Sequence, residues 1–429
     1  MSKKDRESIV VRRAIPDDCF ALSILFDDLY SNPGRPAKYH YPFPQYLDED
    51  WQRKACSGDQ FVWVLAVVGG VTAGCFGAKF DKNSSNTNDL VAEQTGMVVR
   101  PEFRGRGLAH KMMAELCLHL ADARIVLAES RTEEPGGWKA ASKAGFVPIG
   151  YEPYAHKMPN SYEAMLVMGL IPATTLKNRY NDFSVTKAAK ALADIVCPLF
   201  SIESPTLANA MGPSELNPKP YFSDLDQKKS KMSHMAEKKS EYWVHKKVTK
   251  ETALSILDSL DSSNHLSGVV CLDRLEGWDH TGLRYVDEYW LLKNGNLPLA
   301  ITRVMIDNSD RRARILLHQS KSANAKEYAL HDITHRLMSL NREARPKSIV
   351  IEVCASQLGL LFFLEGLDFV PTVYFPAMLL SESKAHDCIQ YAKYINCDLS
   401  IDIEIANKLG TNGVKLMKHV SSFNMKDDL

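Results

Sequence analysis

The chain has 429 residues, and its 52 Lys and Arg residues balance 52 Asp and Glu residues. This length predicts two or three domains, each large enough to bury its own core. The balanced charge gives no overall field for nucleic acid or an anionic membrane, so the expected partner is a small molecule or a protein. The polar start MSKKDRESIV and the lack of any apolar run of 18 residues predict a cytoplasmic protein without a membrane segment.

The nine cysteines form no C-x-x-C pair, and several lie inside apolar patterns such as AELCLHL and VIEVCAS. This distribution favours buried, reduced thiols over disulfides or a metal site.

Residues 1–171 are predicted to form a first domain in which strands and helices alternate. A strand at 9–13 is followed by a helix that begins at Asp17 or Asp18 and ends at Asp28. The runs FVWVLAVV and VTAGCFGAKF flank Gly69-Gly70 and predict a hairpin. The later elements are a strand ending at Val99, a helix from about 107, a strand at 124–128, a helix at 138–144, and closing strands FVPIG and AMLVMGL. The expected fold is α/β, a mixed sheet with helices on its faces.

The stretch VVRPEFRGRGLAHKMM stands where the strand ending at Val99 turns into the next helix. Glycines at such a turn leave backbone N–H groups uncovered, and a helix N-terminus carries about half a positive charge. With Arg104 and Arg106 nearby, the turn is predicted to bind an anion. The alternative is a glycine-rich surface turn with exposed arginines.

Residues 172–250 are predicted to link two domains. They contain one amphipathic helix, SVTKAAKALADIV, then a stretch rich in Pro, Ser and Asn, then a lysine-dense run from Lys228 to Lys250. A solvated linker is the favoured interpretation of this run, and a basic docking patch is the alternative.

Residues 251–429 are predicted to repeat the first architecture. GFVPIGYEP and DFVPTVYFP share F-V-P-x-x-Y-x-P, with Phe146 and Phe369 separated by 223 residues. The same offset places the strand at 124–128 close to SIVIEV, and the helix after Gly107 over residues 330–340.

The first domain resembles the GCN5-related N-acetyltransferase (GNAT) superfamily. Its acyl-CoA signature R/Q-x-x-G-x-G/A corresponds to Arg104-x-x-Gly107-x-Ala109, and KAGFVP is similar to the family's last helix-to-strand ending. Glu93 stands where strand four of the family often carries an acid. The resemblance covers about residues 8–170, and covers 265–380 only weakly through the repeat, which suggests two tandem GNAT-like domains with a degenerate second copy.

The resemblance implies that acetyl-CoA or another acyl-CoA is bound by the first domain, without a metal. The turn and helix start would hold the pyrophosphate, and the strand end would splay from its neighbour and pair with the pantetheine arm. The implied cofactor-binding residues are Met97, Val98, Val99, Arg104, Gly105, Arg106, Gly107, Leu108 and Ala109.

Amine acylation needs a base for the ammonium and an acid for the leaving thiolate. Glu93 is the candidate base, and a strand-end carboxylate paired with a cation is the alternative. Many family members place an acidic tyrosine four residues before the Gly-Phe pair, but this chain has Ala141 there. Tyr151 is the candidate replacement, although the matching Tyr374 suggests a structural role, and His156 is a weaker candidate.

The 223-residue offset maps Arg104 to Ala109 onto Glu327 to Asp332, a segment without glycine or arginine. The second copy is therefore predicted not to bind CoA. Its HDITH run resembles a zinc motif only superficially, because the glutamate and a third ligand are missing.

The leading prediction is an acyl-CoA-dependent N-acyltransferase whose acceptor is a small amine or a protein-borne amine. Two alternatives use the same CoA site: acyl transfer to a carrier-protein thiol, and decarboxylation of an acyl-CoA. A third alternative is a non-catalytic scaffold that senses acyl-CoA.

Overall fold

The computed structural model describes residues 8–30, 44–81, 90–158, 161–208, 243–257, 260, 269–270, 285–381 and 384–423. We call residues 8–170 the first half and residues 243–423 the second half. The predicted Pro, Ser and Asn-rich stretch and most of the lysine-dense run lie outside the described residues.

The described residues of the first half form eleven strands and α-helices, besides short 3-10 turns. They are β1 (Ile9–Arg13), α1 (Cys19–Tyr30), α2 (Glu49–Ser57), β2 (Phe61–Val68), β3 (Val71–Asp81), β4 (Val91–Val99), α3 (Leu108–His119), β5 (Ile125–Arg131), α4 (Gly136–Lys143), β6 (Val147–Lys157) and β7 (Tyr162–Leu170). The predicted strand at 9–13, the hairpin at Gly69-Gly70 and the order of the later elements are confirmed. Helix α2 was not predicted, although Asp48 caps it by accepting from the backbone N–H of Asp50 and Trp51.

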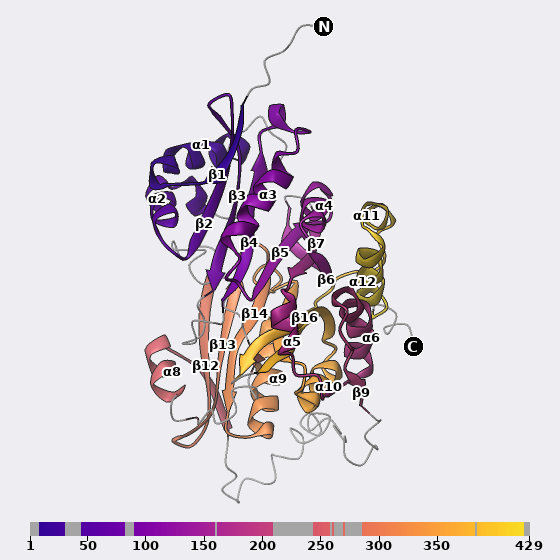
Figure 1. The fold of residues 1–429 in the computed structure, drawn as a ribbon. Coiled ribbons are helices and arrows are strands. Elements are labelled where there is room, and N and C mark those ends of the chain that lie inside the picture. The colour runs from indigo at the N-terminus through magenta and orange to yellow at the C-terminus, as the bar shows by residue number, and fades with distance from the viewer. Residues whose placement is uncertain are drawn as a thin grey trace, which may run out of the picture.

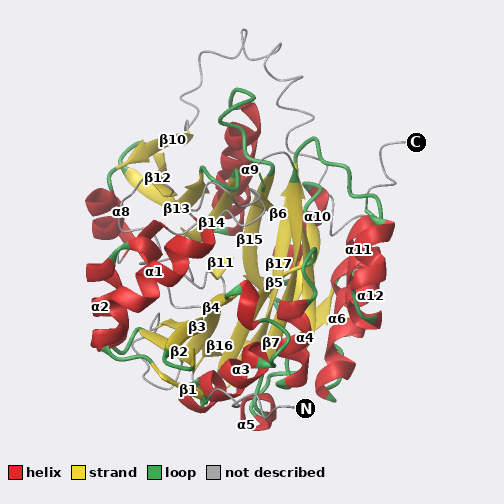
Figure 2. Cartoon of the chain, turned by 90° about the horizontal axis from the view of Figure 1, so that it is seen from above, coloured by secondary structure: helices red, strands yellow, loops and turns green. Residues whose placement is uncertain are grey.

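The connecting segment contains α5 (Ala173–Lys177), β8 (Ser184–Val185), α6 (Lys187–Val196) and β9 (Thr206–Leu207). Helix α6 confirms the predicted amphipathic helix, and its cap Thr186 accepts from the N–H of Ala189. The helix packs on β16, beside α12, at one side of the molecule in both views (Figures 1 and 2).

The second half contains further strands and helices. They are β10 (Trp243–Val248), α8 (Lys250–Leu257), β11 (Val269–Val270), β12 (Tyr285–Asn294), β13 (Leu297–Asp307), β14 (Arg312–Ser320), α9 (Ala323–Ser339), β15 (Ser348–Cys354), α10 (Leu358–Gly366), β16 (Val370–Ser381), β17 (Lys384–Tyr394), α11 (Ile403–Lys408) and α12 (Thr411–Ser421). Strand β10 pairs with β12, so the end of the predicted linker contributes a strand to the sheet of the second half.

One sheet of fifteen strands runs through both halves (Figure 1). Its order is β1-β2-β3-β4-β5-β7-β6-β16-β17-β15-β11-β14-β13-β12-β10. The order β1-β2-β3-β4 then β5-β7-β6 recurs as β10-β12-β13-β14 then β15-β17-β16, and in each half the fourth and fifth of these strands are parallel. The chain thus has a mixed α/β fold with a large mixed sheet and flanking helices.

The two halves meet where β6 pairs with β16, at Gly150 and Val373. A Cβ on Gly150 would lie 2.7 Å from the Cα of Val373, so only glycine fits between these strands. Nearby, the guanidinium of Arg124 donates to the carbonyl oxygens of Ala377 and Met378 in β16. The junction is therefore a close backbone contact at one register pair, to which the side chain of Arg124 adds hydrogen bonds.

The first-half sheet is covered on both faces because β2 alternates between two cores. Val62, Val64 and Ala66 pack with α3, whereas Phe61, Trp63 and Leu65 pack with α1 and α2. None of the helices in the described ranges combines the length and apolar character needed to cross a membrane. The eight described cysteines are free and buried or half-buried, as predicted for reduced thiols.

Candidate active site

Strands β4 and β5 separate partway along their length. They pair from Val91 and Ile125 as far as Gln94 and Ala128, and β4 then continues to Val99. Just beyond the last pair, Gly96 has φ +62°, and a Cβ there would lie 2.8 Å from the ring of Trp63. The register between β3 and β4 also shifts at this point. The bulge at Gly96 therefore bends β4 away from β5 and opens a wedge between them.

The turn after β4 presents backbone N–H groups to open space. Gly105 and Gly107 have φ +77° and +75°, and a Cβ on either would meet nothing within 4 Å. Glycine is favoured here by the left-handed backbone and not by crowding. Gly107 occupies the N-cap of α3, where no side chain caps the helix. Arg104 donates from Nε to the carbonyl oxygen of Val99 at 3.2 Å, which ties the turn to the strand end.

The wedge and the turn open into one cavity of about 690 Å³, which we call the central cavity. Of the predicted cofactor-binding residues, it is lined by Met97, Val98, Val99, Arg104, Gly105, Gly107, Leu108 and Ala109. Arg106 is not a lining residue, and its guanidinium lies 5.1 Å from the centre of the Phe103 ring. The structure thus brings together the strand end and the helix start that the sequence places in succession.

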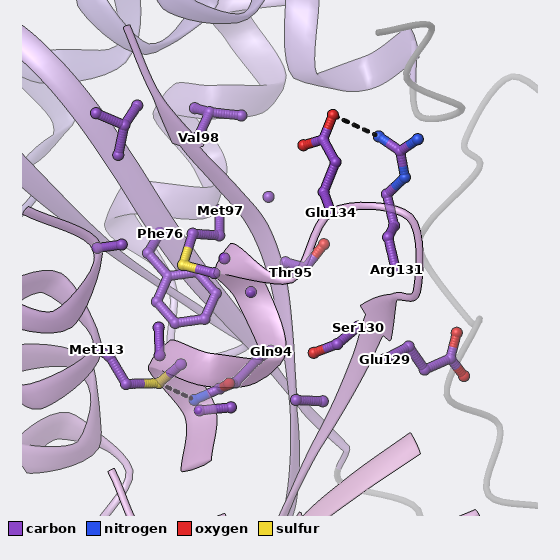
Figure 3. A pocket seen from close by; sticks show the side chains of 18 of the residues that line it. Phe76, Gln94, Thr95, Met97, Val98, Met113, Glu129, Ser130, Arg131 and Glu134 are labelled. Carbon is purple, nitrogen blue, oxygen red and sulfur yellow. Dashed lines mark hydrogen bonds and ion pairs between the residues drawn. The ribbon is translucent and has the colours of Figure 1, made fainter. Parts of the chain in front are cut away.

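Glu93 lines the central cavity just before the wedge opens. Its neighbours alternate between the two faces of β4. Gln94 donates to the Sδ of Met113 on α3 at 3.1 Å, as Figure 3 shows, whereas Thr95 contacts the hydroxyl of Tyr46 at 2.7 Å on the opposite side. Glu93 therefore lies on the face opposite α3, with Lys79 and Leu127 as its partners in the strand register.

The opposite wall of the central cavity comes from the second half. Asp307, Asp310, Arg312 and Arg314, in and beside the β13–β14 turn, line it together with Tyr285. No local pattern in the sequence indicated this contribution, because the residues are brought to the first half only by the continuous sheet.

Charged and polar side chains tie this wall to the first half. The Nδ1 of His156 on β6 lies 3.0 Å from the Oδ1 of Asp310. The Nη2 of Arg314 lies 3.9 Å from the Oε1 of Glu129, and Figure 3 shows Glu129 near the end of β5. The cavity is thus a composite of both halves.

A buried ion pair lies beside the cavity. Arg312 donates to Glu152 through two nitrogens, at 2.6 and 3.1 Å, and Gln390 donates to the same carboxylate. Burial alone would raise the pKa of Glu152, but the charge and hydrogen bonds of Arg312 outweigh it and lower the pKa to about 2. Glu152 is therefore a fixed anion that binds the two halves together.

The structure does not bring Tyr151 to the central cavity. Its side chain is buried in the core, it is not a lining residue, and burial raises the pKa of its hydroxyl. Tyr374, at the matching position, is also fully buried. The prediction of Tyr151 as the acid fails because its side chain packs inside the protein. Ala141 does line the cavity, so the place of the usual tyrosine is filled only by a methyl group.

The second half differs at the corresponding turn. β14 ends at Ser320 and α9 begins at Ala323, so only residues 321–322 connect them, whereas residues 100–107 connect β4 to α3. The predicted correspondence of Arg104–Ala109 with Glu327–Asp332 is wrong, because Glu327–Asp332 lie inside α9. The offset of 223 does hold between β5 and β15 and between β6 and β16, which begin at Val147 and Val370. In the described part of the chain, no cluster of three or more His, Cys, Asp or Glu side chains is arranged to hold a metal ion.

Residues 25–146 match the model of the acetyltransferase (GNAT) family, so this stretch is a GNAT acetyltransferase domain. No curated protein shows significant sequence similarity to the chain.

Three solved structures illustrate the structural matches. A GNAT-family acetyltransferase from Streptococcus pneumoniae is 17% identical, with a TM-score of 0.33, over 38% of this chain and 100% of that one. A GCN5-related N-acetyltransferase from Kribbella flavida is 22% identical, with a TM-score of 0.32, over 38% and 98%. A GNAT phosphinothricin acetyltransferase from Sinorhizobium meliloti, solved with acetyl-CoA, is 16% identical, with a TM-score of 0.32, over 38% and 87%.

Proposed function

We propose that the chain is an N-acyltransferase that uses acetyl-CoA or a related acyl-CoA as the donor and binds it in the central cavity. The observation that carries this proposal is the continuous path from the bent end of β4 through the glycine turn to the start of α3. One path therefore offers an unpaired strand edge for a pantetheine arm and exposed N–H groups for a pyrophosphate.

In this proposal Met97 to Val99 pair with the pantetheine arm, and the backbone from Gly105 to Ala109 holds the two phosphates. Arg104 adds positive charge, and a charged hydrogen bond to a phosphate contributes about 1.5–3 kcal/mol. The thioester then points into the wedge towards Glu93, which lines its base.

Glu93 is proposed as the general base. It takes a proton from the acceptor ammonium, directly or through a water, and the freed amine attacks the thioester carbonyl carbon. The bond between carbon and sulfur then breaks, and the amide product and CoA leave. The acceptor approaches from the wall that the second half contributes, as a small amine or as the amine of a protein.

We also infer that residues 243–423 are a degenerate GNAT-like domain that does not bind CoA. The repeated strand order supports a common origin for the two halves, and the two-residue connection from β14 to α9 removes the anion-binding turn. In this view the second half serves the site of the first half.

A second candidate function uses the same CoA site for acyl transfer to a carrier-protein thiol or for acyl-CoA decarboxylation. This candidate is supported by Ala141, which lines the cavity in place of the usual tyrosine. Thiol acylation and decarboxylation place other demands on proton transfer than amine acylation does.

Mass spectrometry of the purified chain with acetyl-CoA and a panel of amines, with free CoA followed in parallel, tests the proposal. Acetylated amine in step with CoA release is the expected result. CoA release without any amine product would favour the second candidate. Binding of acetyl-CoA without any turnover would indicate that the chain is a non-catalytic scaffold that senses acyl-CoA.

A further inference from the structure

His156 and Asp310 form a histidine–carboxylate pair that spans the two halves and lines the central cavity. Their side chains are 12% and 10% exposed, and the Nδ1 of the histidine lies 3.0 Å from the Oδ1 of the aspartate. Such a pair fixes the orientation of an imidazole ring and its tautomer.

The aspartate is itself held in place from both sides. Its Oδ1 accepts the backbone N–H of Lys157 at 2.8 Å. The turn that carries it is closed by Asp307, whose Oδ1 accepts the N–H of Ser309 at 2.9 Å and of Asp310 at 3.0 Å. Since Asp310 faces Nδ1, the nitrogen of His156 that can exchange a proton with a bound molecule is Nε2.

The catalytic site proposed above has a base but lacks an acid. Ala141 replaces the usual tyrosine, and Tyr151 is buried away from the cavity. Two histidines line the cavity, and His110 belongs to the first turn of α3, beside the proposed phosphate site. His156 is the one placed on the wall away from that turn.

We propose that His156 is the catalytic acid of the transfer reaction and that Asp310 of the second half is its positioning residue; this inference rests on the proposed function. As the amine nitrogen bonds to the thioester carbon and the carbon–sulfur bond breaks, the Nε2–H of the imidazolium gives its proton to the sulfur, so that CoA leaves as a thiol. The proton taken from the ammonium by Glu93 passes to water, and water reprotonates His156. The attacking nitrogen gives its second proton to water as the amide forms, so acylation of an ammonium releases one net proton after one of the two has restored the imidazolium of His156.

Other titratable groups surround the pair. They are Arg311 on the turn, Tyr162 and Glu163 on β7, and Lys157 next to His156 in β6. Glu163 is paired with Arg131 at 2.6 Å, and burial raises the pKa of Tyr162. The role of His156 is therefore tested by comparing the pH–rate profiles of the wild type and a variant without the imidazole.

The test compares His156→Gln and Asp310→Asn with the control His335→Gln, an exposed histidine on α9 in the second half. Asp310→Asn keeps an amide oxygen for the N–H of Lys157 but removes the carboxylate. Acetyl-CoA affinity and KM should stay within about two-fold in all variants, whereas kcat of His156→Gln should fall about 10²-fold, as for loss of a general acid. The kcat of Asp310→Asn should fall about ten-fold, and the kcat of the double variant should be no lower than that of His156→Gln alone.

The alkaline limb of the pH–rate profile should disappear in His156→Gln, because an acid must be protonated to act. Loss of the acidic limb would instead make His156 a base and overturn the assignment. Unchanged kcat with reduced thermal stability would reduce the pair to a structural contact between the halves. If the wild-type chain bound acetyl-CoA but turned over no amine, the proposed function would fail and this inference with it; an active wild type with unaffected variants would remove only the inference.

Discussion

The wedge between β4 and β5 and the wedge between β14 and β15 have the same geometry but different contents. In both, four register pairs join the parallel strands, ending at Gln94 and Ala128 in one and at Ile315 and Ile351 in the other. Beyond that point the first wedge opens into the central cavity. The second is filled by β11, whose Val269 pairs with His318 of β14 and with Val353 of β15. The protein's own chain thus takes the place that an extended ligand would take in the first half.

The turns that follow the two wedges also differ, because the first is open and the second is closed by the protein itself. The first exposes backbone N–H groups over glycines with positive φ. In the second, the helix begins two residues after the strand, and the side chain of Ser322 caps it by accepting from the N–H of Ala325 at 3.2 Å. One wedge is therefore organised for a ligand and the other for packing.

The largest expected effect comes from changing the first turn. A chain with Arg104→Glu and Gly107→Asp should lose nearly all acetyl-CoA binding in calorimetry, by about 10³-fold or more. Arg104→Glu removes a charged hydrogen bond of about 1.5–3 kcal/mol, and the two changes add two carboxylates beside the phosphates. The matched control is Ser322→Asp, which places a carboxylate at the start of α9 and should leave binding unchanged. Survival of binding in the double variant would mean that this turn does not hold CoA.

Changing the base should affect the rate more than the affinity. Glu93→Gln nearly preserves shape and removes the carboxylate at the base of the wedge, so kcat should fall by on the order of 10²-fold, with acetyl-CoA affinity retained. The residual rate should rise with pH as free amine becomes available. The control Glu352→Gln, a glutamate on β15 beside the second wedge, should leave kcat unaltered. Unchanged kcat in Glu93→Gln would give Glu93 a structural role, and a loss confined to affinity would make it a determinant of the strand splay.

The sequence predicted what local patterns encode. Strand β1 and the Gly69-Gly70 hairpin depend on alternation and turn residues within a few positions, and they match the structure. The pair of His156 and Asp310 joins residues far apart in the chain, so no local pattern could reveal it. The 223-residue offset failed at α9 because the second half lacks most of the turn, and a constant offset cannot represent a deletion.

The packed second wedge should also respond to acid. His318 is fully buried with its Nδ1 2.8 Å from the hydroxyl of Thr302, and burial lowers its pKa from 6.5 to about 3. The folded state therefore keeps His318 neutral while the unfolded chain takes up a proton below pH 6.5. The free energy of unfolding should fall as the pH drops from 6.5 towards 3, by about 2 kcal/mol from this group between pH 7 and pH 5.

Urea unfolding at pH 7 and pH 5 measures this effect as the difference between the wild type and His318→Gln, which removes the titrating ring. Between pH 7 and pH 5, His318→Gln should lose less free energy of unfolding than the wild type. His110→Gln, at an exposed site in the first half, should lose as much free energy of unfolding between the two pH values as the wild type. If all three proteins lost the same free energy of unfolding, the second wedge would admit a proton and would not be packed as a core.

The smallest expected effect decides which feature excludes CoA from the second half. Val269→Pro removes a backbone N–H from β11 and should weaken its pairing with β14 and β15, which lowers stability. If the missing turn is what excludes CoA, emptying the wedge gives the phosphates no new site, and calorimetry should still find one acetyl-CoA per chain with unchanged affinity. Val269→Thr, which retains the strand, is the control for stability. A second binding event in Val269→Pro alone would show that β11 blocks a competent site, and the second half would then be an occluded copy of the first and not a decayed one.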